Sequence, residues 1–143
     1  MGTNVSTSLC IKRTEDKVRH VSRGPFIGRN YELYSLMGLR GRGGPDPVFE
    51  ARGMPSDTDS IVKFEHGVSP NGDIDPDYRF HSWLTAGELR AVAEAYESLP
   101  PAEPDEVPRI GPGFAATLGA MEALDRWCGE TGGGYALLVF SFG

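Results

Sequence analysis

The sequence predicts an α+β fold: a small, mostly antiparallel sheet built from both chain ends, with about three helices packed on one face. Two observations carry this prediction. Segments near both ends have the apolar patterns of β-strands, and the segments between them have the spacing and capping residues of helices. A chain of 143 residues fits a single domain, residues 1–143, with a core that needs no disulfide or metal.

The first strands are expected to form a hairpin. In the segment 5–13, Val5, Leu9 and Ile11 alternate with polar residues, as in a half-buried strand. Residues 14–16 suit a turn, and residues 17–22 can return as the second strand.

The stretch Gly28–Leu39 predicts a short helix. Asn30 is a good N-cap, and Leu33, Leu36 and Met37 lie on one helical face. A long loop rich in glycine, proline and arginine follows it.

Residues 56–59 offer several helix caps before an apolar segment that contains Ile61, Val62 and Phe64. That segment fits either a short helix or a strand. In the loop 67–78, alternating aspartates resemble a calcium loop, but Tyr78 stands where glycine is needed and no closing glutamate follows. A solvated acidic turn is the better interpretation.

The strongest local signal follows a short strand at 79–83. Thr85 and Glu88 have the spacing of a capping box, and Leu84 and Leu89 that of a hydrophobic staple. The helix that begins there must end before the prolines at 100–101.

A second long helix is predicted between a proline-rich acidic loop at 99–113 and the glycines at 132–134. Residues 135–142 are apolar on both faces, which indicates a central strand. With helices on one face only, apolar sheet surface would be left over, and a homodimer would cover it. The helical spacing is kept by Phe114, Leu118, Met121, Leu124 and Cys128.

The charge distribution limits the partners. A net charge of −6 argues against a general nucleic-acid binder. Residues 1–50 carry eight Lys/Arg against five acidic residues, so an anion site is expected in or near the first third. No apolar run approaches the length of a membrane span. Cys10 and Cys128 are read as two reduced, buried thiols of a cytoplasmic protein.

Residues with metal-binding or catalytic chemistry are scattered. The three histidines have no paired spacing for a metal, and no cofactor motif is present. Ser82 beside His81 is not a catalytic triad. Hydrolysis with Asp57, Asp59 or His81 as general base is conceivable, but the pattern singles out none of them, so the sequence favours a binding protein over an enzyme.

The best candidate site is a pocket for an anionic ligand. Arginine presents paired donors to phosphate or carboxylate, and tyrosine and tryptophan offer flat surfaces to a ring. The alternative is structural: Arg29 or Arg52 would pair with Asp57 or Glu32, and Trp83 would be buried beneath a helix. The candidate ligand-binding residues are Arg29, Asn30, Tyr31, Arg40, Arg52, Asp57, His81 and Trp83.

Several blocks together resemble a family of uncharacterised small proteins of bacteriophages and prophages. They are Gly-Arg-Asn-Tyr-x-Leu-Tyr at 28–34, Arg40, Arg-Gly-Met-Pro-x-Asp at 52–57, His-Ser-Trp-Leu-Thr-x-x-Glu-Leu at 81–89, and the closing strand with Phe140. The resemblance carries over no catalytic residue. It implies a virus-encoded accessory protein of the host cytoplasm.

Three functions are consistent with these features. The first is a homo-oligomer that binds a small anionic, nucleotide-like ligand, for instance to sequester a host immune signalling nucleotide as a counter-defence. The second is an interaction module that docks on a host protein through the apolar strand face or the acidic loop 99–108. The third is a small nucleotide hydrolase.

Overall fold

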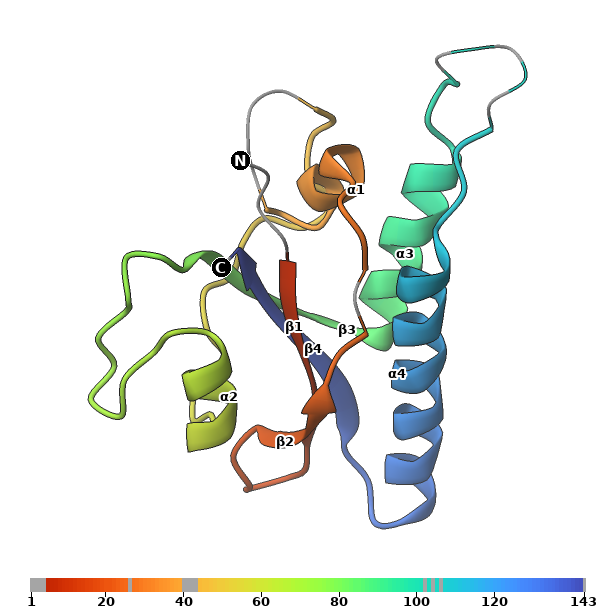
Figure 1. Cartoon of the computed structure of the whole chain (residues 1–143). Helices are drawn as coiled ribbons and strands as arrows, with labels where there is room; N and C mark the ends of the chain where they lie inside the picture. Colours follow the sequence, from red (N-terminus) through yellow and green to blue (C-terminus); the bar gives the residue numbers. More distant parts are fainter. Residues whose placement is uncertain are drawn as a thin grey trace.

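The computed structural model describes residues 5–25, 27–39, 44–101, 103, 105 and 107–142. Figure 1 shows the chain, and the secondary structure confirms the predicted α+β class. In chain order, the elements are β1 (Val5–Lys12), β2 (Arg19–Arg23), α1 (Tyr31–Leu36), α2 (Ser60–Glu65), β3 (Arg79–Thr85), α3 (Ala86–Glu97), α4 (Pro112–Glu130) and β4 (Tyr135–Phe142).

The sheet is antiparallel, with strand order β2-β1-β4-β3. The two central strands come from opposite ends of the described chain, and their register runs from Val5 opposite Phe142 to Lys12 opposite Tyr135. The predicted hairpin of β1 and β2 and the predicted central position of β4 are both confirmed.

One face of the sheet is covered by three helices, α1, α3 and α4 (Figure 1). Their apolar faces bury a common core with every second residue of the strands. Leu9, Leu138 and Phe140 supply the sheet side of this core. The helices supply Leu33, Met37, Leu89, Val92, Phe114 and Met121.

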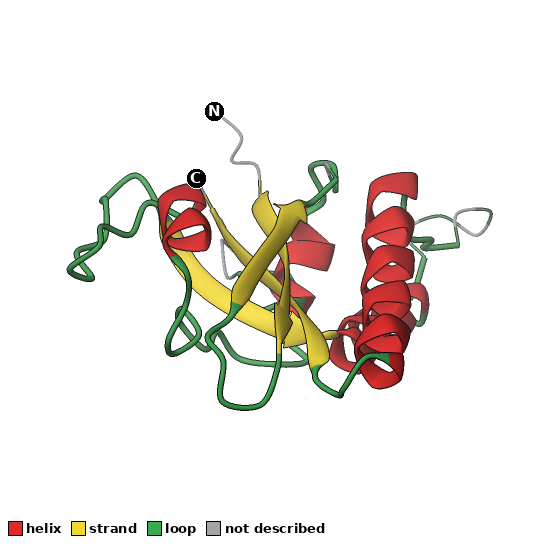
Figure 2. Cartoon of the chain, turned by 90° about the horizontal axis from the view of Figure 1, so that it is seen from below, coloured by secondary structure: helices red, strands yellow, loops and turns green. Residues whose placement is uncertain are grey.

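The opposite face is covered as well, which the sequence did not predict. Val62 of α2 packs there with Cys10, Leu137 and Val139, and all four side chains are buried. Figure 2 shows α2 on the other side of the sheet from α3 and α4. α2 therefore covers part of the sheet face from which a homodimer was inferred.

The segment 52–59 forms backbone hydrogen bonds at both outer edges of the sheet. At the β3 edge, the Gly53 amide donates to the His81 carbonyl over 2.9 Å. At the other edge, Val18, just before β2, donates to the Asp57 carbonyl over 2.8 Å and accepts from the Asp59 amide over 3.0 Å. Backbone groups that could otherwise pair with another chain are partly blocked in this way.

The predicted helix starts are confirmed. The Asn30 side chain accepts from the Leu33 amide over 3.1 Å, and Thr85 and Glu88 form both hydrogen bonds of the capping box. The segment after residue 59, left open between helix and strand, is a helix that Asp59 caps by accepting from the Val62 amide over 3.0 Å. The Ile61 and Phe64 side chains of this helix are exposed.

Candidate functional site

The structure does not bring the predicted ligand-binding residues into one pocket. Arg29, Asn30 and Tyr31 lie at the start of α1, where Asn30 caps the helix and its Nδ2 donates to the Tyr96 hydroxyl over 2.9 Å. Arg29 and Tyr31 are exposed there. Arg40 lies outside the described residues.

The other predicted residues lie on the segment 52–59 and on β3. Arg52 stacks over the Trp83 ring at 4.5 Å, and its two terminal nitrogens donate to the two carboxylate oxygens of Glu88. These hydrogen bonds are the main reason why the pKa of Glu88 falls to about 2. The arginine therefore ties the loop to the start of α3. Its partner is Glu88, not Asp57 or Glu32 as the structural alternative expected.

Asp57 and His81 line the same hollow, of about 400 Å³, together with Lys63. His81 is buried, and its Nε2 lies 2.7 Å from the carbonyl oxygen of His66. A carbonyl only accepts, so Nε2 carries a proton. We call this hollow the His81 hollow.

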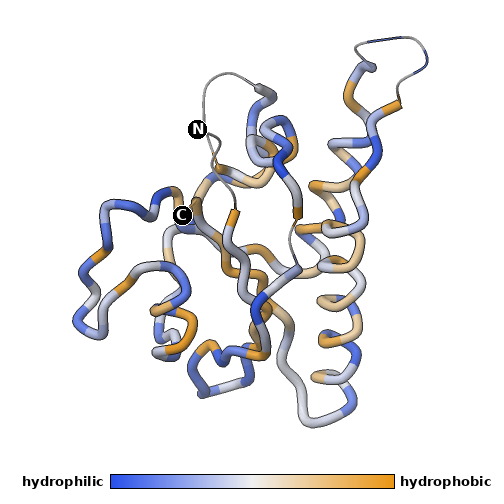
Figure 3. Tube along the Cα trace, in the orientation of Figure 1, coloured by the Kyte–Doolittle hydropathy of each residue, from blue (hydrophilic) through white to orange (hydrophobic). Residues whose placement is uncertain are grey.

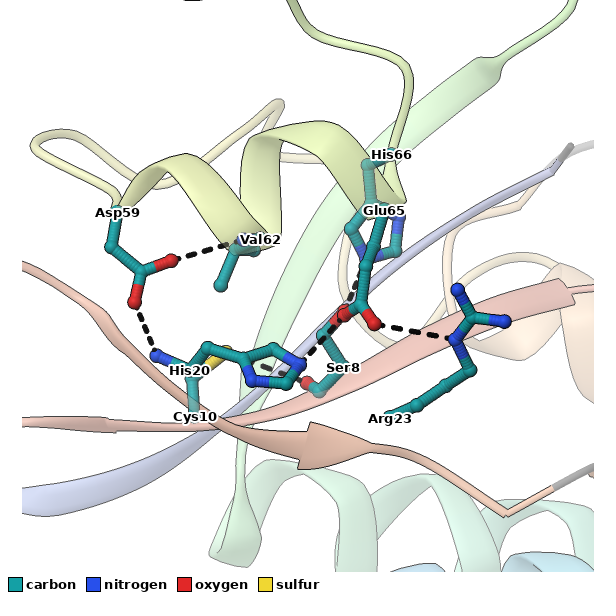
Figure 4. A network of polar contacts seen from close by, with 8 residues as sticks. All are labelled: Ser8, Cys10, His20, Arg23, Asp59, Val62, Glu65 and His66. Carbon is teal, nitrogen blue, oxygen red and sulfur yellow. Dashed lines mark hydrogen bonds and ion pairs between the residues drawn. The ribbon is translucent and has the colours of Figure 1, made fainter.

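The richest polar cluster was not predicted and surrounds Glu65 at the end of α2 (Figure 4). The Ser8 hydroxyl of β1 donates to Glu65 Oε1 over 2.6 Å. The oxygen of this hydroxyl also lies 2.8 Å from His66 Nε2. On the other side of the ring, His66 Nδ1 lies 2.7 Å from the Ser141 hydroxyl of β4. These contacts join α2 to the two central strands.

The charges of this cluster fix the direction of its hydrogen bonds. Because the Ser8 proton points to Glu65, the Ser8 oxygen can accept from a protonated His66 Nε2. In a neutral ring Nδ1 is then unprotonated, and it accepts a hydrogen bond from the Ser141 hydroxyl. Burial lowers the pKa of His66 to about 4, so the ring is neutral at pH 7, as this direction requires.

Two basic side chains of β2, Arg23 and His20, also approach Glu65. Arg23 Nε donates to Glu65 Oε2 over 3.2 Å. His20 Nε2 lies 2.9 Å from Oε1, within ion-pair distance but without the geometry of a hydrogen bond. Burial alone would raise the pKa of Glu65, but the hydrogen bonds from Ser8 and Arg23 and the nearby His20 outweigh it, so the pKa is lowered.

This cluster is built for attachment rather than for nucleophilic chemistry. Ser8, His66 and Ser141 are completely buried, so a substrate has no access to either hydroxyl. The nearby Cys10 thiol is also buried and unpaired, and burial raises its pKa to about 12, so it is not a nucleophile at neutral pH. Cys128 is likewise buried and unpaired, as the sequence predicts for both cysteines.

An open cleft lies beside the cluster, between α2 and the loop 67–78, with a volume of about 560 Å³. Gly67 shapes it, since its φ is 67° and a Cβ there would lie 2.2 Å from Cδ2 of Tyr78. Figure 3 shows that the loop is largely hydrophilic. We call this cleft the Glu65 cleft; it is lined by Arg23, Phe64, Glu65, Gly67, Val68, Ser69, Asp73, Ile74, Asp75 and Tyr78.

Large apolar side chains are exposed around the Glu65 cleft. Of the residues that line the cleft, Phe64 has a side chain that is 80% exposed and Ile74 one that is 54% exposed. Ile61, three residues before Phe64 on α2, is also 54% exposed. Val68 and Ile74 also line the His81 hollow, so the two depressions adjoin across these residues. The loop and α2 together thus form an apolar surface with a depression on each side of Ile74.

Comparisons of the chain with protein-family models, with curated proteins and with solved structures found no match. Within the described residues, no group of three or more His, Cys, Asp or Glu side chains could hold a metal ion. No helix of the described chain is long and apolar enough to cross a membrane.

Proposed function

We propose that this protein is an interaction module, and that a partner protein docks on the surface formed by α2 and the loop 67–78. The observation that carries this proposal is the exposure of Phe64 beside the Glu65 cleft. A phenylalanine in water gains free energy on burial, of about 1.5–3 kcal/mol, so a partner that covers it is favoured.

The anchoring of α2 supports the same proposal. The helix has only six residues and buries a single apolar side chain, Val62, so it would be marginal by itself. Asp59 caps its start, and the Glu65 and His66 contacts fasten its end to β1 and β4. A helix fixed at both ends presents Phe64 in one position, which lowers the entropy cost of binding.

The proposal inherits its biological setting from the resemblance to phage proteins. An accessory protein of a virus would use such a surface on a protein of its bacterial host. This surface differs from the two that the sequence suggested for docking, the apolar strand face and the acidic loop 99–108.

The test is site-specific cross-linking inside bacterial cells that express the protein. A photo-reactive amino acid at position 64 should capture one defined protein. The same protein should be captured from position 61, and Phe64→Asp should lower that capture from position 61 at least tenfold. Position 107 is the matched control, because Val107 is also exposed, at 59%, but lies in the loop 99–111. Equal capture from positions 64 and 107 would contradict the proposal.

A small anionic, nucleotide-like ligand in the His81 hollow is the second candidate. Two predicted site residues, Asp57 and His81, line this hollow together with Lys63, which supplies a cation. A ligand that binds the native state raises its melting temperature. A panel of cyclic nucleotides and ADP-ribose derivatives should therefore produce a shift that Lys63→Ala removes, and no shift at millimolar ligand would exclude this candidate.

A further inference from the structure

We propose that the segment of the partner that enters the Glu65 cleft is basic and carries one large apolar side chain. This inference rests on the proposed function and specifies the chemistry of the partner. It follows from two properties of the cleft that occur together, an apolar wall and an excess of carboxylates.

The apolar wall is formed by Phe64, Val68, Ile74 and the ring of Tyr78. Phe64 and Ile74 are more than half exposed, so the wall is not filled by the chain itself. A volume of about 560 Å³ accommodates one large side chain and the backbone on either side of it.

The carboxylates belong to Glu65, Asp73 and Asp75, against a single lining cation, Arg23. Asp73 and Asp75 are exposed, and within the described chain neither forms an ion pair. The pKa of Glu65 is lowered, so its carboxylate is charged at neutral pH. The net charge of −6 reinforces the field, and a cationic segment is therefore the complementary partner.

Arg23 occupies the place that a cation of the partner would take. Its side chain is 76% exposed, and its Nε donates to Glu65 Oε2. Ser8 holds the other oxygen, Oε1, from inside the protein. A lysine or arginine of the partner can thus replace Arg23 at Oε2 while Glu65 stays in position. In this arrangement Arg23 competes with the partner.

The experiment is fluorescence anisotropy with the intact protein and labelled synthetic peptides of about ten residues. The first peptide has one leucine flanked by lysine and arginine; the second has glutamate in place of the basic residues; the third has serine in place of the leucine. We expect the first peptide to bind and the other two to bind at least tenfold more weakly.

Charge-matched variants locate the binding site. Asp73→Asn combined with Asp75→Asn should weaken the first peptide about fivefold, since two partly screened charge contacts are lost. Glu94→Gln combined with Glu97→Gln removes the same charge from the exposed face of α3 and should change the affinity less than twofold. The Arg23→Ala variant should bind the first peptide more tightly than the parent protein does. Arg19 forms an exposed ion pair with Asp16, and Arg19→Ala should not tighten the binding of this peptide.

Each other outcome has a distinct meaning. Equal binding of the acidic and basic peptides, or no binding at all, would overturn this inference, and cross-linking from position 64 would still decide the proposed function. If Phe64→Asp converts a dimer into a monomer in sedimentation, a second copy of this chain covers the cleft and the inference is wrong. Loss of peptide binding in the Glu94/Glu97 variant to the same extent as in the Asp73/Asp75 variant would assign it to net charge alone.

Discussion

His66 is a neutral base in a buried position, and this makes the native state sensitive to acid. In the unfolded chain the ring takes up a proton near pH 6.5, but in the native state only near pH 4. Between these values the unfolded state binds more protons, so the free energy of unfolding rises with pH. The contribution of His66 to the free energy of unfolding is fully present above pH 6.5 and is lost as the pH falls toward 4.

We therefore expect the native protein to lose about 3 kcal/mol from this group between pH 7 and pH 4. His66→Gln should flatten the pH dependence of the unfolding free energy in this range, whatever it does to stability at pH 7. Urea titrations at several pH values measure this slope. Thr85→Ala is the control, because it destabilises a distant helix start and should keep the slope. A parallel slope in His66→Gln would show that other groups cause the acid sensitivity.

The contacts of His66 also show what could not be predicted from the sequence at this scale. Asn30 and Thr85 were recognised as caps, and Asp59 was one of four candidates at 56–59, because a cap bonds to an amide three residues later. Ser8 contacts Glu65 and His66 across 57 and 58 residues of chain, and no local pattern contains that information. The one available signal was Ser141, a hydroxyl within an otherwise apolar central strand, which needs a buried polar partner.

At the scale of elements, the start of α3 combines two interactions in one side chain. Glu88 accepts from the Thr85 amide over 3.0 Å as part of the capping box, and it also pairs with Arg52. In a capping box alone, Glu88→Ala would cost less stability than Thr85→Ala, because water can replace part of the glutamate's contact. We expect the ion pair with Arg52 to remove this difference.

Thr85→Ala should lower the free energy of unfolding by about 1 kcal/mol, the usual cost of a lost N-cap. Glu88→Ala should cost at least as much, because it leaves the stacked Arg52 guanidinium without its carboxylate partner. Glu94→Ala, on the same helix and exposed, is the control for helix propensity. Thermal unfolding of the three variants in one buffer ranks them. Thr85→Ala as stable as the parent protein would contradict the assigned cap.

The helices and strands were largely predictable because periodicity and caps are local. The pattern did not determine which side of the sheet each helix would cover. Ile61, Val62 and Phe64 are all apolar, yet only Val62 is buried. Burial of Val62 depends on Cys10, Leu137 and Val139, which lie far away in the sequence.

At the scale of the molecule, a chain that ends after Gly134 lacks β4, the strand that pairs with both β1 and β3. β4 supplies the partner for β1 and for β3, and its buried residues reach into the cores on both faces of the sheet. We expect this truncated chain to be unfolded, with the far-ultraviolet spectrum of a disordered chain and rapid digestion by protease. The chain of 143 residues is the control, and protection of the truncated chain would show that β1, β2 and the helices form a stable core by themselves.

The same topology sets the timing of folding during translation. The ribosome adds Val5 137 residues before Phe142, its partner in the register, and at 5–20 residues per second this interval is about 7 to 27 seconds. Throughout that interval β1 cannot pair with β4. Leu9 and Cys10, which belong to the cores on the two faces of the sheet, cannot yet pack against β4. The sheet can therefore be completed only after β4 has been synthesised, and until then the apolar residues that it covers have no partner strand.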